Sequence, residues 1–444
     1  MTSRCGAMGR LAVMTCLGVT GISAQADDFW NALTGGKPDL FVRYRYEQVN
    51  DGKPATRNAY ANTVRTALGY RTGLYHGFGA YLQMQDVRVL ADGNLFNDGG
   101  SNGVTGRAVI VDPENTELHQ YVLRYRGLPK TTLMLGRQEI TYRKAPFHRF
   151  VGNVLWRDNW QSYDGLRLVS NYLPATKIDY AYIWEVNRIF GEDNPLPDRA
   201  HFRVAGHLLN IHYSGFQFGT IEPYVYLLDF ESSVLSTRNL SSATYGARFQ
   251  GARPWVGQAA KVLYAAEFAH QTDYGSNPFN VDNNYYLLEL GLSKAFTGSP
   301  IQSVTLKGDI EVLEGEGTVA SGTLKGNGAF QTPLGTNHAF QGWADRFLVT
   351  PADGVVDLYG TLAVKVLGSK LVGVYHDFSS DHGDYDYGTE WDAMLTHTFK
   401  THYTVGVKYA AYEADQNATN LARNKAGGQI YDLDKLWAWV QIKF

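Results

Sequence analysis

The sequence predicts an all-β fold, namely a transmembrane antiparallel up-and-down β-barrel, and the strongest sign is its last strand. Counting back from the terminal Phe444, every second residue is apolar: Ile442, Val440, Ala438 and Leu436. A period of two residues indicates a β-strand. A sheet in lipid has to close, because no water is present to satisfy the N–H and C=O groups of an edge strand. An edge strand of a soluble sheet is the alternative for this stretch taken alone.

The N-terminus predicts that the chain is exported. Two arginines and a short apolar stretch, residues 11–22, precede small residues at Ala24 and Ala26. This arrangement is typical of a secretory signal peptide, and the apolar stretch is too short to span a membrane as a helix. We therefore expect residues 1–26 to be a cleaved signal peptide and residues 27–444 to form one outer-membrane barrel domain.

Composition agrees with a Gram-negative outer membrane as the location. The chain has 29 Tyr, 21 Phe and 9 Trp, which suits the aromatic girdles of a barrel. After residue 26 no apolar run approaches 18 residues, which excludes a helical inner-membrane protein. The formal net charge of -3 argues against nucleic acid as a partner. The expected partners are outer-membrane lipid and the barrel assembly machinery that inserts such proteins.

Eighteen segments show strand-like alternation, which predicts 18 strands. In the first of them Val42 and Tyr44 face one way, whereas Arg43 and Arg45 face the other. Apolar residues outside and polar residues inside are typical of a barrel wall around a wet lumen, although a soluble sandwich has the same period. The predicted strands are centred near residues 44, 67, 82, 121, 135, 166, 181, 210, 226, 246, 265, 288, 308, 361, 374, 394, 406 and 439.

The connections between these segments favour the membrane barrel. Connections after even-numbered segments are short, as at 72–77 and 400–402, and those after odd-numbered segments are long. This alternation is typical of short periplasmic turns and long extracellular loops, with both termini in the periplasm. The longest connection, 314–354, contains aromatic residues that need burial, so we expect it to fold against the inner wall and narrow the lumen. A cap outside the barrel is the alternative.

The alternation also predicts which charged side chains face the lumen. In the first half of the chain the inward set is basic, and it comprises Arg43, Arg45, Arg65, Arg71, Arg124, Arg126 and Arg167. In the second half it is acidic, and it comprises Glu267, Glu289, Asp309 and Glu311. Because consecutive strands are neighbours, a cationic wall should face an acidic one. Arginine keeps its charge and binds carboxylates with two parallel N–H groups, which predicts anion selectivity and a carboxylate-bearing solute. The alternative is that these arginines pair with lumen acids.

No motif indicates an enzyme, and we expect no cofactor. The chain has no Gly-x-Ser-x-Gly and no serine placed beside a base, so a barrel-embedded hydrolase is the least favoured function. Residues 381–386 form an acidic stretch that could hold a structural calcium ion in an extracellular loop, but they lack the EF-hand spacing. No zinc spacing is present, so no metal site is predicted.

The segment from Phe330 to Asp345, with the run His-Ala-Phe-Gln-Gly-Trp-Ala-Asp, resembles the signature of the alginate-export domain family of outer-membrane porins. Residues 135–138, 150–157 and 186–191 are similar to that family too, so the likeness covers nearly the whole mature chain. The signature residues that we single out in this loop are His338, Trp343, Asp345 and Arg346. The resemblance implies an 18-stranded barrel with an arginine-lined channel that exports the polyuronate alginate. The family's exporter has a long periplasmic plug near strands 16 and 17, whereas the turn here is only 400–402.

The sequence thus predicts an outer-membrane channel that passes anionic saccharides or small carboxylates, with alginate export as one form of that function. A general or substrate-specific uptake porin, whose facing walls produce a transverse field, is the alternative.

Overall fold

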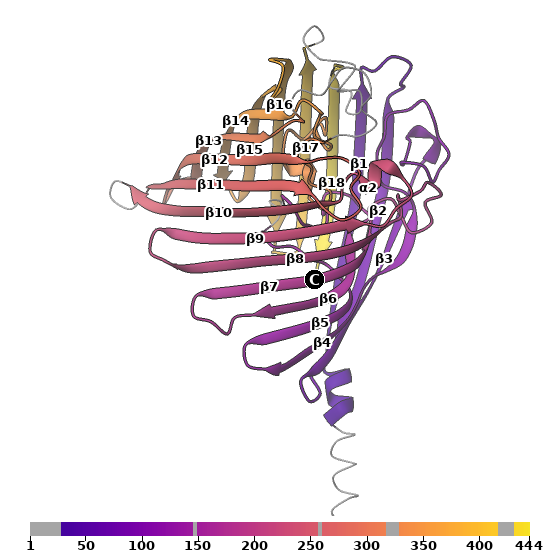
Figure 1. Ribbon diagram of the computed structural model, residues 1–444, viewed down its shortest axis with the longest axis vertical. Coiled ribbons are helices and arrows are strands. Elements are labelled where there is room, and N and C mark those ends of the chain that lie inside the picture. The colour runs from indigo at the N-terminus through magenta and orange to yellow at the C-terminus, as the bar shows by residue number, and fades with distance from the viewer. Residues whose placement is uncertain (1–27, 145–148, 256–259, 317–327, 416–429) are drawn as a thin grey trace, which may run out of the picture.

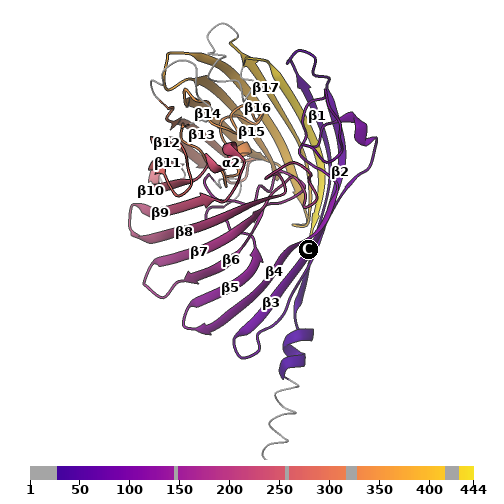
Figure 2. The same cartoon turned by 45° about the vertical axis from the view of Figure 1, so that its right-hand side comes forward.

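The barrel is closed by pairing between its first and last strands. The computed structural model describes residues 28–144, 149–255, 260–316, 328–415 and 430–444. Within them eighteen strands form one antiparallel sheet, in which β1 (Lys37–Asp51) pairs with both β2 (Ala59–Arg71) and β18 (Leu433–Lys443). Figures 1 and 2 show these strands side by side and the others slanting around the barrel. The fold class predicted from the sequence is confirmed.

Each predicted strand centre lies within the corresponding strand of the structure. The strands between β2 and β10 are β3 (Phe78–Val89), β4 (Asn115–Leu128), β5 (Thr131–Gln138), β6 (Ser162–Ser170), β7 (Thr176–Asn187), β8 (His201–Phe216) and β9 (Gly219–Phe230). The remaining strands are β10 (Ser242–Trp255), β11 (Ala260–Asp273), β12 (Asp282–Ala295), β13 (Ile301–Leu313), β14 (Val355–Val366), β15 (Ser369–Ser379), β16 (Asp386–Phe399) and β17 (Tyr403–Ala414).

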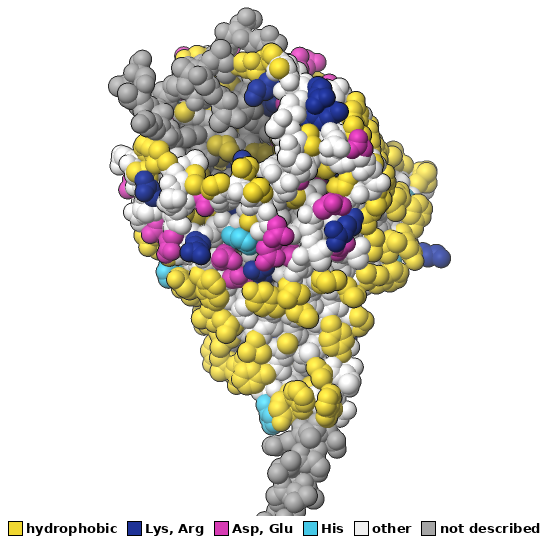
Figure 3. Space-filling view, turned by 90° about the vertical axis from the view of Figure 1, so that its right-hand side faces the viewer, with side chains coloured by type: hydrophobic (Ala, Val, Ile, Leu, Met, Phe, Trp, Pro, Cys, Tyr) yellow, Lys and Arg dark blue, Asp and Glu magenta, His cyan; other side chains and the backbone are white. Residues whose placement is uncertain are grey.

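The outer wall is an apolar belt that suits contact with lipid. In β2, Leu68 points outward with 53% of its surface exposed, whereas the neighbouring Ala67 points inward and is fully buried. Large apolar side chains are exposed around the barrel, and aromatic ones such as Tyr172, Phe216 and Trp255 lie near the short turns. Figure 3 shows hydrophobic side chains gathered over the lower part and right edge of one face, with charged side chains above them. This arrangement is expected of a barrel that spans an outer membrane.

The two ends of the barrel differ in the length of their connections. The turn end holds the short connections, and Phe444 exchanges backbone hydrogen bonds with Leu40 there, at 2.9 and 3.2 Å. The loop end holds the long ones, although the loop between β15 and β16, residues 380–385, is no longer than the turn at 72–77. At the β15–β16 hairpin, the length of the connection therefore does not indicate which end of the barrel it belongs to, whereas elsewhere it does.

Three long loops of the loop end fold into the lumen. We call them L2 (residues 90–114), L3 (residues 139–161) and L7 (residues 314–354). Phe150 of L3 and Phe330 of L7 are buried against each other, with ring centroids 6.0 Å apart. Both rings also contact Tyr285 on the inner wall of β12. The hydrophobic core of the molecule therefore lies inside the barrel, between the loops and the wall.

The helical content is small but greater than the sequence pattern predicted. Residues 28–34 form a short helix outside the barrel at its turn end, and α2 (Leu235–Arg238) lies between β9 and β10. Among the described residues no helix has the length and apolar character needed to cross a membrane. The expected signal peptide, residues 1–26, lies outside the described residues.

Candidate functional site

The described parts of loop L3, residues 139–144 and 149–161, contact wall strands on different sides of the lumen. Asp158, near its C-terminal end, binds Arg43 of β1. Arg143, near its N-terminal end, binds Glu267 of β11, and Arg149 binds Glu311 of β13. The loop therefore presents an acid to the predicted arginine wall and bases to the predicted acidic wall.

At the arginine wall, loop carboxylates and carbonyls surround the guanidinium groups. Arg43 donates to Asp158 Oδ1 at 2.6 Å, and Arg45 pairs with Asp112 of L2. Arg65 donates to the carbonyl of Asp158 at 2.5 Å. Their exposed fractions are only 6%, 1% and 0%. Burial works to raise the pKa of Asp158, but Arg45 and Arg43 outweigh it and hold that pKa below its usual range.

The acidic wall is neutralised in the same way. Arg143 donates to the two carboxylate oxygens of Glu267 at 2.5 and 3.0 Å, and Arg248 of β10 pairs with the same side chain at 3.0 Å. Arg149 donates to Glu311 Oε1 at 2.7 Å. These ion pairs are almost fully buried from water, so removing one partner would leave the other charge buried and uncompensated.

The other predicted lumen residues are spread over the wall. Glu289 and Asp309 both lie beside Lys307, with the Asp309–Lys307 contact at 3.6 Å. Arg167 pairs with Asp179 of β7 at 2.7 Å. The remaining three predicted arginines lie near the turn end: Arg71, Arg124 and Arg126. The structure therefore groups Arg43, Arg45 and Arg65 around one end of L3 and leaves the others apart.

Loop L7 is attached to L3 and to the wall through His338. The imidazole stacks on Trp156 of L3 with centroids 4.6 Å apart, and its Nδ1 lies 2.6 Å from Asp345 Oδ1. Its Nε2 lies 2.7 Å from Nζ of Lys408 on β17. Burial and the nearby Lys408 lower the pKa of His338 to about 3, against the opposing effect of Asp345. A neutral imidazole that donates to Asp345 and accepts from Lys408 fits these contacts.

The tip of L7 rests on two carboxylates of β16. The backbone N–H of Trp343 donates to Asp392 at 3.2 Å, and that of Ala344 donates to Glu390 at 2.7 Å. Gly342 has a φ of +78°, and a Cβ there would overlap the Glu390 carboxylate. Farther along, Arg346 binds Asp51 at 3.0 Å. All four predicted residues of the loop motif therefore lie where L7 meets the inner wall or L3.

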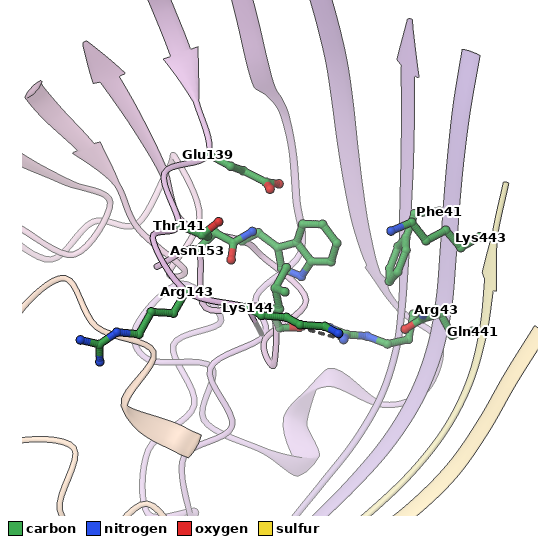
Figure 4. A pocket seen from close by; sticks show the side chains of 11 residues that line it. Phe41, Arg43, Glu139, Thr141, Arg143, Lys144, Asn153, Gln441 and Lys443 are labelled. Carbon is green, nitrogen blue, oxygen red and sulfur yellow. Dashed lines mark hydrogen bonds between the residues drawn. The ribbon is translucent and has the colours of Figure 1, made fainter. Parts of the chain in front are cut away.

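A cavity of about 390 Å³ lies between L3 and the turn end of the wall. In Figure 4, Phe41, Arg43 and Lys443 approach it from the strands, whereas Glu139 and Lys144 belong to L3. The full lining is Phe41, Arg43, Glu139, Thr141, Arg143, Lys144, Asn153, Leu155, Trp160, Gln441 and Lys443. It contains four basic side chains and one acidic one. We call it the L3 pocket.

Two bases of the L3 pocket keep their charge available to a solute. Arg43 and Arg143 are held by Asp158 and Glu267, as described above. Lys144 and Lys443 are exposed, and neither has an ion-pair partner within the described part of the chain. The pocket is therefore electropositive because of its lysines rather than its arginines.

Sequence reasoning missed the L3 residues that dominate this site. Alternation assigns strand side chains to the lumen or to lipid, but it says nothing about a loop. The signal in L3 was its length of 23 residues, combined with charged residues beside tryptophans at 156–160. Among the described residues no three metal-ligating side chains converge on one point, and Asp381 of the acidic loop accepts from the backbone N–H of Gly315 at 3.0 Å.

The closed 18-stranded barrel, with its apolar belt and inserted loops, has the architecture of a membrane-spanning β-barrel. Solved porin structures have the same fold. OccK9 (OpdG) of Pseudomonas aeruginosa matches with a TM-score of 0.66 and 12% identity, over 93% of this chain and 100% of that one. OccAB3 of Acinetobacter baumannii matches with a TM-score of 0.64 and 13% identity, over 93% and 100%.

A structure of Pseudomonas aeruginosa OpdK with vanillate also matches, with a TM-score of 0.64 and 13% identity over 93% of this chain and 99% of that one. No protein-family model matches the chain, and no curated protein sequence matches it. The resemblance to the alginate-export family therefore gains no support from those comparisons. At these identities the similarity establishes the fold.

Proposed function

We propose that the protein is an outer-membrane channel that takes small carboxylate-bearing solutes through the L3 pocket. The observation that carries this proposal is the charge of that pocket, where four bases meet one acid. Arg43 and Arg143 are already paired, whereas Lys144 and Lys443 have no ion-pair partner among the described residues, so their charge can attract an anion. Counterions concentrate in a charged cleft with low-dielectric walls, which favours passage of anions.

The shape of the pocket favours a small solute with an apolar part. Phe41 and Trp160 meet edge to face at 5.0 Å, and both rings line the cavity. The volume of about 390 Å³ lies at the low end of the range for small-molecule sites, roughly 300–1,000 Å³. Vanillate, which the OpdK structure contains, is an aromatic carboxylate, and a solute of that kind fits the combination of rings and lysines.

An anionic saccharide remains within the proposed solute class, since a uronate carries the same carboxylate. The motif that resembles the alginate-export family, residues 330–346, acts here mainly as the attachment of L7 to the wall. Loops L2, L3 and L7 occupy the lumen, which favours a single uronate over a polymer such as alginate. A general porin with a transverse field is less favoured, because L3 neutralises charges on both walls.

Flux into proteoliposomes tests this proposal with matched solutes. We expect glucuronate to enter faster than glucose, and benzoate faster than benzyl alcohol, at low ionic strength. The double variant Lys144→Gln/Lys443→Gln should lower each preference roughly threefold to tenfold, because it removes the unpaired positive charges. Lys53→Gln, in the exposed loop between β1 and β2, is the control and should change nothing. Equal entry of the charged and neutral member of each pair would contradict the proposal.

A further inference from the structure

The helix at residues 28–34 is attached to the outside of the barrel at its turn end. The N–H of Gly73, in the turn between β2 and β3, donates to the carbonyl of Ala32 at 2.7 Å. The hydroxyl of Tyr70 donates to the carbonyl of Leu33 at 2.6 Å. The ring of Phe29 meets Tyr75 edge to face at 5.6 Å. Figures 1 and 2 show the segment hanging below the strands on the side of β2 and β3.

The helix gathers its large apolar residues on one side, where Phe29 also contacts Tyr75 of the turn between β2 and β3. At 100° per residue, Phe29, Leu33 and Trp30 occupy neighbouring directions and form an arc of roughly 100°. Their exposed fractions are 47%, 37% and 58%, so about half of this apolar surface is uncovered. Ala32 points toward the turn that holds the helix, and Asn31 lies on the remaining side.

This apolar arc is continuous with the lipid-facing belt. Leu74, in the turn that binds the helix, and Phe78, at the start of β3, are both exposed, and Leu82 continues the same outer face of β3. Figure 3 shows hydrophobic side chains extending from the wall down to the narrow lower end of the molecule. Because lipid covers the apolar belt, the apolar arc of the helix, which continues the belt at the turn end, should contact the lipid leaflet at that end.

We propose that Phe29, Trp30 and Leu33, together with Leu74 and Phe78, form an interfacial anchor in the periplasmic leaflet of the outer membrane. The partner is phospholipid at the boundary between headgroups and acyl chains. Tryptophan and phenylalanine favour that boundary, because they combine a large apolar surface with tolerance of nearby water. The helix then holds the start of the folded chain flat beneath the wall and away from the turn-end opening of the lumen.

Spin labels in lipid vesicles test the anchor directly. Both cysteines of the chain, Cys5 and Cys16, precede Asp27, so a protein that starts at Asp27 accepts a single introduced cysteine cleanly. The label is placed at Leu33→Cys, with Leu82→Cys as the lipid reference and Lys53→Cys as the water reference. The vesicles contain phosphatidylethanolamine and phosphatidylglycerol. Accessibility to oxygen and to a water-soluble nickel chelate reports the depth of each label.

We expect the label at Leu33 to favour oxygen over the nickel chelate severalfold, as the Leu82 label does, and the label at Asn31→Cys to give a lower ratio. Adding Phe29→Ser and Trp30→Ser should move the Leu33 label to the value found at Lys53. Gel electrophoresis of unheated and heated samples in detergent verifies that each variant is folded, because a folded barrel migrates differently from the heat-unfolded chain. A Leu33 label that matches Lys53, or one shielded from both relaxants by a protein contact, would overturn the proposal.

Discussion

At the scale of single residues, the lumen is governed by pairing between loop charges and wall charges. Asp158 is fully buried and lies within 3.6 Å of Arg45 as well as 2.6 Å of Arg43. Without the Asp158 carboxylate, the buried guanidinium groups of Arg43 and Arg45 would lose a counter-charge that water could not replace. Three of the arginines predicted from the sequence, Arg43, Arg45 and Arg65, therefore hold L3 in place, and Arg43 and Arg45 do so by pairing with lumen acids, which is the alternative that strand alternation left open.

The variant Asp158→Asn should loosen L3. Removing one partner of a buried pair costs about 3–5 kcal/mol, and here the cost falls on the attachment of the loop to β1. We expect faster proteolysis within L3 and a larger single-channel conductance. Asp86→Asn is the matched control, because the Asp86–Arg88 pair, at 2.7 Å, lies on the solvated outer face. Exposed pairs contribute only about 0–1 kcal/mol, so identical behaviour of the two variants would contradict this assignment.

His338 should make the docking of L7 sensitive to acid. Its pKa in the folded loop is about 3, below the ordinary value near 6.5, because burial and Lys408 disfavour the charged form. An undocked loop takes up a proton between those two values and a docked loop does not. The stability of the docked state is therefore complete above pH 6.5 and decreases as pH falls toward 3.

Limited proteolysis of L7 between pH 7.5 and 4 measures this effect. We expect cleavage to accelerate on acidification in the wild type and much less in His338→Gln, which cannot gain the proton. The same acid response in both proteins would show that other groups control the loop.

At the scale of elements, the strands were predictable and the loop positions were not. Alternation located all eighteen strands, since each side chain of a barrel strand must face either lipid or the interior. The aromatic content of 314–354 correctly indicated that L7 packs inside. The sequence did not predict which residues the L7 motif contacts. Ala344 and Glu390 are 46 residues apart in the chain, and Arg149 and Gln341 are 192 residues apart. No local pattern encodes contacts at that separation.

The tip of L7 should depend on Gly342. Alanine at this position is strained by the φ of +78°, and its Cβ would overlap the Glu390 carboxylate. Backbone strain of this kind costs on the order of 1–3 kcal/mol, so Gly342→Ala should displace the tip and raise conductance. Gly308→Ala is the control, because nothing lies within 4 Å of a Cβ there. Unchanged conductance in a folded Gly342→Ala protein would mean that the tip does not narrow the passage.

At the scale of the whole molecule, a closed barrel provides the wall, and the proposed selectivity depends on the loops inserted into it. Arg43 and Arg45 on β1 carry the opposite charge to Glu267 on β11 and Glu311 on β13, but L3 carries the complementary charges across the lumen and cancels much of the field. What remains is the positive L3 pocket at the turn end, where Lys144 and Lys443 are unpaired within the described residues. We therefore expect Lys144 and Lys443, which the strand alternation did not single out, to determine whether the channel prefers anions or cations.

The reversal potential of the wild-type channel in planar bilayers, under a salt gradient, tests this account most directly. The account predicts anion preference near 0.1 M salt that fades near 1 M, because the screening length shrinks from about 10 Å to about 3 Å. Lys144→Gln/Lys443→Gln should remove most of the preference while the buried Arg43 and Arg45 remain in place. A wild-type channel that prefers cations at low salt would contradict it.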